Sequence, residues 1–341
     1  MVVSGELPSP RSIEVHPTNR CVNDCEACIG QNIRFDGKLD LSYNLMRDIV
    51  SYASSLKIAL IISGNHCEPF VNRNVREVLK YILEEEPIST LLLFTTTYHL
   101  DDEIIGLIAN TNISIYLAVG LYGHSEESYL KTQRGRASPK VFQRSLENTL
   151  KLVRASSGNS KVYIDIHYLA TPASTDDFEG LKRHMKFLLG QGVSRFYISN
   201  PLRPIDHKGD PSLYGHLDEE HYGRLKGLLS AAFRGKGYNL TPFIEDRGSG
   251  AQNPFKRCYV QYFFPTVGAD SGIYPCCYTT SHQGMKRGLQ LGKLEHGTSF
   301  SDVWFSDANR DFNPSKVCPT CSKSDHAFNL IVEKAVNRFR T

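Results

Sequence analysis

Apolar runs alternate with amphipathic segments through the first 200 residues of this 341-residue chain. The run Ile58–Ile62 is apolar at every position, which is typical of a strand buried on both faces of a parallel sheet. Further β-rich runs predict strands over Ser12–His16, Leu91–Phe94, Ile113–Gly120, Val162–Tyr168 and Ser194–Ser199. Between them, apolar residues at helical spacing predict helices over Leu45–Leu56, Val75–Glu84, Lys140–Arg154 and Asp177–Leu189.

Strands that alternate with helices of this length favour a parallel sheet that curves toward a barrel. The six predicted strand–helix units are fewer than the eight of a complete barrel. The predicted fold is therefore α/β, with a partial (βα)6 TIM-like barrel over residues 1–210.

The periodicity weakens after Pro204, and the chain gains turns that are rich in Gly, Pro and Ser. We interpret residues 211–255 as a bridge that contains one amphipathic helix over Leu217–Phe233. Residues 256–341 are predicted to form a small α+β domain. Within it, Asp270–Cys276 is typical of a β-hairpin with an Asp-Ser-Gly turn.

The composition is that of a soluble globular enzyme, with 40% hydrophobic and 22% charged residues. A formal net charge of +3 is too small to indicate a nucleic-acid partner or an anionic membrane surface. The sequence contains no apolar stretch long enough for a signal peptide or a transmembrane helix. Nine cysteines without an export signal therefore predict metal or redox chemistry and a cytoplasmic location.

Three cysteines, Cys21, Cys25 and Cys28, follow the first predicted strand at C-x3-C-x2-C spacing. Three thiolates on one loop can bind three irons of a [4Fe–4S] cluster, which normally takes four cysteines. The fourth iron then stays open to a small molecule. A zinc site normally adds a second pair of ligands to a C-x2–4-C pair, and this triplet fits that pattern poorly.

The spacing and position of the triplet resemble those of the radical S-adenosylmethionine (SAM) superfamily. The resemblance implies that the open iron binds SAM, and that an electron from the cluster cleaves SAM to methionine and a 5′-deoxyadenosyl radical. It also implies a partial (βα)6 barrel, in agreement with the strand–helix count. Ala27 departs from the family pattern, which has an aromatic residue before the third cysteine.

Other strand ends resemble the SAM contacts of the family. Gly64, Glu68 and Pro69 occur where relatives have a "GGEP" turn that holds the methionine amino group, although Cys67 departs from that motif. Gly120 takes a position near the SAM ribose, and Arg134 one near the SAM carboxylate. An ordinary β–α loop at the turn, and a surface position for Arg134, stay as alternatives.

Polar residues also mark the ends of the fifth and sixth predicted strands, where α/β barrels carry their chemistry. Asp165 and His167 are two positions apart, so they face the same side of their strand. Asn200 and Arg203 follow the next strand. These four residues are candidate substrate contacts if that side is the barrel interior, and buried polar groups of the core otherwise.

A second group of cysteines lies in the C-terminal part: Cys258, Cys276, Cys318 and Cys321. Four thiolates can close one iron–sulfur cluster, and a zinc site would fit the same spacing. In a chain that also contains the triplet, the arrangement resembles the twitch domain, which is a shortened SPASM domain. This resemblance implies one auxiliary [4Fe–4S] cluster. We take Cys276 as the ligand because the position after a proline matches the family better. Cys67 and Cys277 are then left without an assigned metal.

The layout most resembles twitch-type dehydrogenases and epimerases that act on aminocyclitols and sugars in antibiotic biosynthesis. It implies a radical SAM enzyme with a carbohydrate-type small-molecule substrate and a flavodoxin- or ferredoxin-type electron donor. We expect epimerisation slightly ahead of dehydrogenation, with Cys277 ahead of Cys67 as hydrogen-atom donor. Either cysteine is otherwise an ordinary small core residue.

Two other functions stay open. One is a maturase that modifies a ribosomally made peptide, although the 20 residues before Cys21 leave little room for an additional N-terminal peptide-binding domain. The other is a non-enzymatic iron–sulfur or zinc protein.

Overall fold

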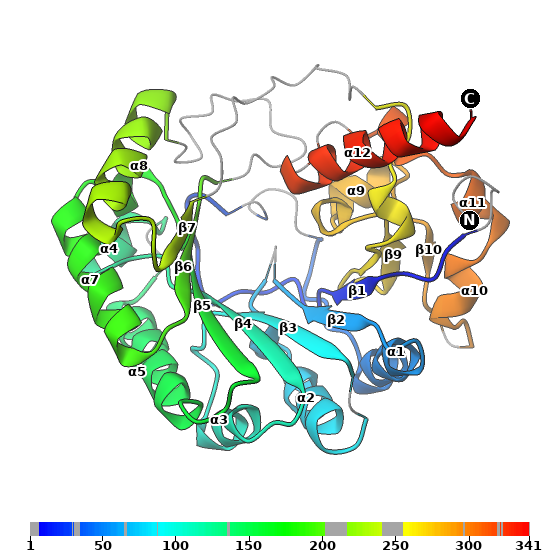
Figure 1. The fold of residues 1–341 in the computed structure, drawn as a ribbon. Helices are drawn as coiled ribbons and strands as arrows, with labels where there is room; N and C mark the ends of the chain where they lie inside the picture. Colours follow the sequence, from blue (N-terminus) through cyan, green and yellow to red (C-terminus); the bar gives the residue numbers. More distant parts are fainter. Residues whose placement is uncertain are drawn as a thin grey trace.

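A computed structural model describes residues 7–28, 30, 35–64, 67–86, 88–134, 137–201, 217–240, 255–295, 297–318, 321 and 323–340. Its described strands form one sheet in the order β10-β9-β8-β1-β2-β3-β4-β5-β6-β7 (Figure 1). Neighbouring strands from β1 to β7 pair in parallel. Their bounds are β1 Ser12–Val15, β2 Ala59–Ile62, β3 Thr90–Thr95, β4 Ser114–Gly120, β5 Val162–Leu169, β6 Arg195–Ser199 and β7 Tyr238–Leu240.

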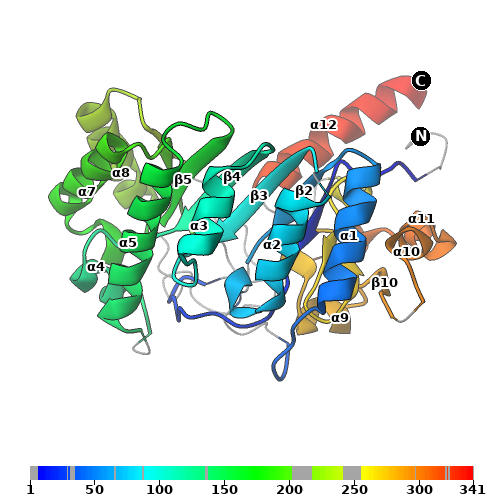
Figure 2. The same ribbon diagram turned by 90° about the horizontal axis from the view of Figure 1, so that it is seen from below.

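Helices cover the convex side of the curved sheet (Figures 1 and 2). They are α1 Tyr43–Ser55, α2 Asn74–Glu84, α3 Asp102–Ala109, α4 Glu126–Lys131, α5 Pro139–Ala155, α6 Pro172–Thr175, α7 Phe178–Gln191 and α8 Glu219–Phe233. Polar N-caps fix where they begin: Ser42 and Asp101, for example, accept backbone N–H groups of α1 and α3. The α/β class and the partial barrel predicted from the sequence are confirmed.

Successive side chains along a strand point to opposite faces of the sheet, so one set packs in the core and the other faces the concave side. In β5, Ile164, Ile166 and Tyr168 pack into the hydrophobic core beneath the helices. Asp165 and His167 therefore face the concave side. The concave side of the sheet is the surface on which a site can be built.

The predicted bridge differs from expectation in one respect. Its helix, α8, is present, but β7 follows it and pairs in parallel with β6. The bridge thus adds a seventh parallel strand to the described barrel. The three residues of β7, Tyr238–Leu240, are too short to produce a recognisable alternation in the sequence.

The C-terminal part continues the same sheet beyond β1. The short strands β8 (Thr266–Val267) and β9 (Gly272–Tyr274) form the predicted hairpin, with Ser271 at a φ of 65° in the turn. β8 also pairs in parallel with β1. The remaining elements are β10 Gly292–Lys293, the helices α9 His282–Lys286, α10 Phe300–Trp304, α11 Asp307–Asp311 and α12 Lys323–Arg340, and the 3-10 turns η3 Val260–Tyr262, η4 Cys277–Thr279 and η5 Pro314–Lys316.

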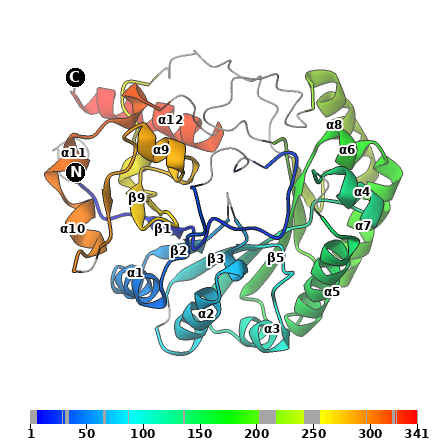
Figure 3. The ribbon, with the colours of Figure 1, turned by 180° about the vertical axis from the view of Figure 1, so that it is seen from behind.

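The C-terminal elements lie beside β1, at the opposite end of the curve from α4 and α7 (Figure 3). Trp304 is fully buried, and its indole N–H donates to the Pro8 carbonyl at 3.0 Å. This contact joins the start of the described chain to α10 of the C-terminal part. Within the described residues, no helix combines the length and hydrophobicity that crossing a membrane requires.

Candidate functional site

The loop that carries the cysteine triplet begins after β1 and is held by a glutamine from the other side of the barrel. Gln133, just after α4, donates from Nε2 to Cys25 Sγ at 3.4 Å. Its Oε1 accepts the Asp24 N–H at 2.9 Å. Because one amide contacts both the thiol and the adjacent peptide, it fixes Cys25 in one orientation, in the way that hydrogen bonds around a metal site orient its ligands.

Two tyrosines complete the surroundings of the triplet. The Tyr129 hydroxyl donates to Asn23 Oδ1 at 2.7 Å in a buried contact. Burial raises the pKa of Tyr122 well above its ordinary value, and charges on the triplet cysteines and Glu68 raise it further. Tyr122 is therefore a neutral phenol, buried close enough to the triplet for the charges of its thiols to affect it. Neither tyrosine nor Gln133 belongs to a local sequence motif, so the sequence does not mark them as neighbours of the triplet.

Gly120, a predicted SAM contact, lies directly beside Tyr122. A Cβ atom at position 120 would be 2.7 Å from the Tyr122 hydroxyl oxygen. The glycine thus leaves the space that the phenol occupies next to the triplet loop.

The turn after β2 brings Gly64 and Cys67 into contact. The Cys67 N–H donates to the Gly64 carbonyl at 3.1 Å, and a Cβ at position 64 would lie only 1.9 Å from the Cys67 carbonyl oxygen. Cys67 is buried, and its Sγ donates to the Ser63 carbonyl at 3.7 Å. The intervening residues 65–66 lie outside the described part of the chain.

Glu68 links three strand ends. Its backbone N–H donates to the Arg20 carbonyl at 2.9 Å, on the loop after β1. Its carboxylate accepts the Thr95 hydroxyl and the Thr96 N–H, both at 2.6 Å, at the end of β3. Burial raises the pKa of Glu68, and these hydrogen bonds oppose that shift. Pro69 follows as the first residue of the 3-10 turn η1 (Pro69–Val71).

Arg134 lies against the triplet loop. Its backbone N–H donates to the Asp24 carbonyl at 2.9 Å, and its Nε is 3.8 Å from Asp24 Oδ1. The side chain is 41% exposed, so the guanidinium can still reach a ligand at the loop.

Two of the predicted substrate residues lie together on the concave side. Asp165 forms an ion pair with Arg195 of β6 at 2.6 Å. The His167 ring stacks on Tyr197 at a centroid distance of 4.9 Å and meets the Phe94 ring edge-on at 5.4 Å. Burial, and then the Arg195 charge, lowers the pKa of His167 to about 4, so this imidazole is neutral at pH 7.

The other two substrate candidates are not brought to this surface by any described contact. Asn200 is buried, and its Oδ1 accepts the Leu217 N–H at 3.2 Å, which holds the segment just before α8 against the end of β6. Arg203 lies outside the described residues.

A chain of polar side chains joins the barrel to the C-terminal part, and no motif in the sequence marks it. The Thr280 hydroxyl is 2.8 Å from His16 Nδ1, and His16 Nε2 is 3.0 Å from Glu14 Oε1. The Ser63 hydroxyl donates to the same Glu14 oxygen. This chain runs from the segment after Cys276 to the strand end that precedes the Gly64 turn.

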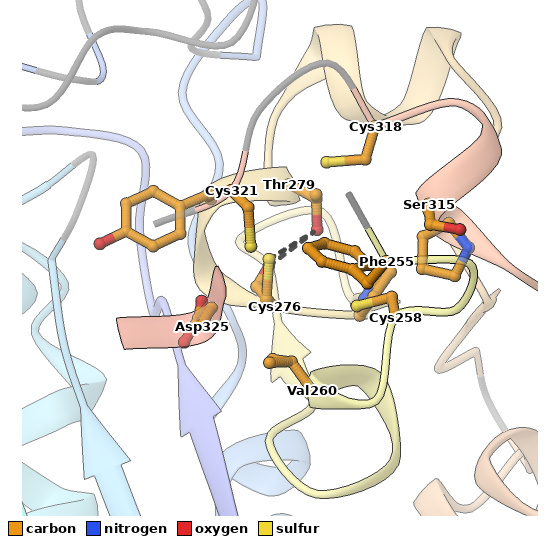
Figure 4. A pocket seen from close by; sticks show the side chains of 12 residues that line it. Phe255, Cys258, Val260, Cys276, Thr279, Ser315, Cys318, Cys321 and Asp325 are labelled. Carbon is orange, nitrogen blue, oxygen red and sulfur yellow. Dashed lines mark hydrogen bonds between the residues drawn. The ribbon is translucent and has the colours of Figure 1, made fainter. Parts of the chain in front are cut away.

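The second group of cysteines borders one pocket (Figure 4). Cys258 precedes η3, Cys276 follows β9, Cys318 follows η5 and Cys321 precedes α12. Segments far apart in the sequence therefore bring these four thiols together. Phe255, Val260 and Pro275 make part of the lining apolar.

Burial raises the pKa of the pocket thiols, to about 11 for Cys258 and well above the ordinary value for Cys276 and Cys321. Neighbouring thiolates raise these pKa values further. Binding of a metal centre would offset this cost, because cysteines bind metals as thiolates. Among the described side chains, no three His, Cys, Asp or Glu groups converge as a site for a single metal ion.

Cys277 begins η4, immediately after the pocket residue Cys276. Since β9 ends at Tyr274, strand alternation does not govern which way Cys277 points. The Cys277 carbonyl accepts the Thr280 hydroxyl at 2.8 Å, and this hydroxyl also contacts His16. Cys277 therefore belongs to the segment that faces the end of β1.

No protein-family model and no curated protein matches this chain. Solved structures do match. SuiB of Streptococcus suis, bound to its precursor peptide SuiA, is 15% identical over 96% of this chain and 74% of that one, with a TM-score of 0.62. The structure called native anSMEcpe with bound AdoMet and Cp18Cys peptide is 14% identical over 93% and 85% of the two chains, with the same TM-score. The chain thus has the fold of radical SAM enzymes, as the sequence resemblance predicted.

Proposed function

We propose that this protein is a radical SAM enzyme with one auxiliary iron–sulfur cluster. The observation that supports the proposal is that two separate cysteine groups lie on segments connected to one continuous sheet, within a fold that matches radical SAM enzymes. One group is a triplet loop held by Gln133, and the other is a pocket bordered by four thiols. The donor sets fit two [4Fe–4S] clusters, one with an open iron and one fully ligated.

The residues divide into two cluster sites and one SAM site. Cys21, Cys25 and Cys28 would hold the first cluster, and the four pocket cysteines the auxiliary one. Gly64, Glu68, Pro69, Gly120 and Arg134 would shape the SAM site around Tyr122. When bound, the first cluster would supply the electron that cleaves SAM to methionine and the radical that removes a hydrogen atom from substrate carbon.

The concave faces of β5 and β6 suit a hydroxyl-rich substrate. The Asp165–Arg195 pair offers both acceptors and donors, and the neutral His167 imidazole has one nitrogen of each kind. Tyr197 and Phe94 provide apolar walls beside it. These features support a carbohydrate-type secondary metabolite, and we propose a sugar or aminocyclitol.

We propose epimerisation as the outcome, with Cys277 as the hydrogen-atom donor. Its thiol would give a hydrogen atom to the substrate radical and would then need one electron and one proton to be restored. Supporting this, Cys277 lies between Cys276 of the pocket and Thr280, whose hydroxyl reaches the end of β1. Cys67 on the Gly64 turn is the second choice. In dehydrogenation the substrate radical would lose an electron and a proton instead.

Peptide modification is the second candidate function. The structures of SuiB and anSMEcpe that match this fold are described as bound to a precursor peptide and to the Cp18Cys peptide. Turnover in deuterated water separates the outcomes for any accepted substrate. An epimerase would place one solvent deuterium at the inverted carbon, whereas a dehydrogenase would give a product two hydrogens lighter and without label.

Iron analysis and SAM cleavage test the central proposal without a known substrate. Reconstituted protein should bind about eight irons and form 5′-deoxyadenosine with SAM and dithionite. Replacing Cys21, Cys25 and Cys28 with Ala should abolish 5′-deoxyadenosine and leave about four irons. The matched variant Cys277→Ala should keep both clusters and SAM cleavage. Zinc in place of iron, or SAM cleavage by the triple variant, would contradict the proposal.

A further inference from the structure

One face of α12 presents two polar side chains to the auxiliary pocket. Asp325 lines the pocket, and Asn329 follows four residues later on the same side of the helix. Neither is a thiol, and neither is needed to complete a set of four cysteine ligands. Their position beside the pocket thiols still gives each of them an electrostatic effect on whatever the thiols bind.

The orientation of the Asn329 amide follows from its contacts. Its Oδ1 accepts the backbone N–H groups of Tyr259, at 2.5 Å, and Val260, at 3.1 Å. The amide oxygen therefore accepts two hydrogen bonds from η3 and the residue before it, and the NH2 group points away from these two N–H groups. Nδ2 lies 3.8 Å from the Sγ atoms of both Cys258 and Cys321. Asn329 thus donates to two of the four thiols from a fully buried position.

Asp325 acts on a different part of the pocket. Its carboxylate borders the pocket together with Cys276 and Cys321. Figure 4 likewise shows the Asp325 carboxylate on the side of Cys276 and Cys321, away from Cys258 and Cys318. The negative charge is therefore concentrated beside Cys276, the neighbour of Cys277.

We infer that Asp325 and Asn329 set the reduction potential of the auxiliary cluster in opposite directions. The inference rests on the proposed function, because it takes the pocket to hold an iron–sulfur cluster. Potentials of such clusters depend on net charge and on hydrogen bonds to the sulfurs. A carboxylate repels the added electron and lowers the potential, while N–H donors to sulfur stabilise the reduced form and raise it.

The position of Asp325 gives this balance a role in the reaction. A lower potential makes the reduced cluster a better electron donor. The carboxylate lies on the Cys276 side of the pocket, and Cys276 directly precedes Cys277, the thiol that in the proposed reaction must regain an electron after it gives up a hydrogen atom. Asp325 would thus favour electron transfer toward the proposed donor, whereas Asn329 keeps the cluster reducible.

A redox titration followed by electron paramagnetic resonance tests the inference. The 341-residue chain would carry Ala at Cys21, Cys25 and Cys28, so that the iron signal comes from the pocket. Asp325→Asn should shift the midpoint potential to a more positive value, and Asp325→Glu should restore it toward that of the parent. Asp311→Asn, which removes an exposed carboxylate from α11 of the same domain, is the control and should leave the potential unchanged.

Asn329→Asp provides the opposite change. It keeps an oxygen for the two backbone N–H groups but replaces the donor to Cys258 and Cys321 with a negative charge. The potential should become more negative, and the double variant that combines Asp325→Asn with Asn329→Asp should lie between the two single variants. Equal potentials for Asp325→Asn and Asp311→Asn would overturn the inference, as would a positive shift for Asn329→Asp.

Iron content separates this result from the larger proposal. If the parent chain binds zinc or no metal in the pocket, the proposed function itself fails. If the parent binds about four irons and Asp325→Asn does not change the potential, only the assignment of Asp325 and Asn329 fails.

Discussion

Replacing Gly64 with Ala tests whether the turn after β2 is a rigid part of the SAM site. The new Cβ would lie 1.9 Å from the Cys67 carbonyl oxygen, 2.8 Å from its carbon and 3.1 Å from Pro69 Cδ. Two of these three neighbours are backbone atoms, which cannot rotate away. The turn must therefore open, and the hydrogen bond from the Cys67 N–H to the Gly64 carbonyl must lengthen.

The cost can be estimated from the overlap. Forcing extra atoms into a well-packed site costs about 1–3 kcal/mol. Loss of the Cys67–Gly64 hydrogen bond adds about 1 kcal/mol. We expect the free energy of unfolding to fall by about 2–4 kcal/mol in total. If the turn also holds SAM, we expect its affinity to fall by at least about tenfold, which corresponds to about 1.4 kcal/mol.

Gly106→Ala is the matched control. Gly106 lies inside α3, and a Cβ there would meet no atom within 4 Å. Ala is favoured over Gly in a helix interior by about 1 kcal/mol, so this variant should be slightly more stable than the parent. The same chemical change is thus expected to have opposite signs at the two sites.

The assays are denaturant unfolding and SAM binding to the reconstituted protein, read from the SAM-induced change in the electron paramagnetic resonance spectrum of the reduced triplet cluster. Iron content should stay the same in both variants, because neither substitution replaces a cysteine ligand. A Gly64→Ala protein with unchanged stability would show that the turn adapts. Loss of stability with unchanged SAM affinity would remove Gly64 from the SAM site.

Two further predictions follow from buried ionisable groups. Glu68→Gln replaces one carboxylate oxygen with an NH2 group opposite the Thr96 N–H or the Thr95 hydroxyl. The free energy of unfolding, measured by thermal unfolding, should therefore fall by about 1–3 kcal/mol. Unchanged stability would show that the carboxylate does not hold the strand ends together. His167 and His184 both have a pKa lowered by burial to about 4, so the unfolded state binds more protons between about pH 6.5 and pH 4. The free energy of unfolding should therefore fall as the pH drops through this window, and a His184→Gln variant should lose less stability there than the parent does.

The sequence predicted the parts of the fold that repeat. Every predicted barrel strand is present, because long apolar runs such as Ile58–Ile62 signal burial on both faces. The C-terminal hairpin was predicted because its Asp-Ser-Gly turn is a local signal. The structure brings the second cysteine group to one pocket, and the assignment of both groups to iron–sulfur clusters stays a prediction.

The surroundings of the cysteines could not be predicted, because they depend on tertiary pairing. Gln133 reaches Cys25 across 108 positions of sequence, and Asn329 reaches Cys258 across 71. Gln after a helix and Asn within a helix are both common, so neither residue type signals a contact with a cysteine. Only the barrel closure that brings α4 to the triplet loop, and the packing of α12 on η3, turn these amides into neighbours of the thiols.

The strand β1 connects the two halves of the proposed site. It pairs with β2 on one edge and with β8 on the other, and it leads directly into the triplet loop. The contacts from Thr280 through His16 and Glu14 to Ser63 cross the same strand. Because sheet pairing and side-chain hydrogen bonds both fix the pocket segment against β1, bringing the pocket and the Gly64 turn together requires no hinge between separate domains. In the proposed reaction, electron transfer between them would depend on the fixed polar groups at this edge, so a charge as local as that of Asp325 would affect it.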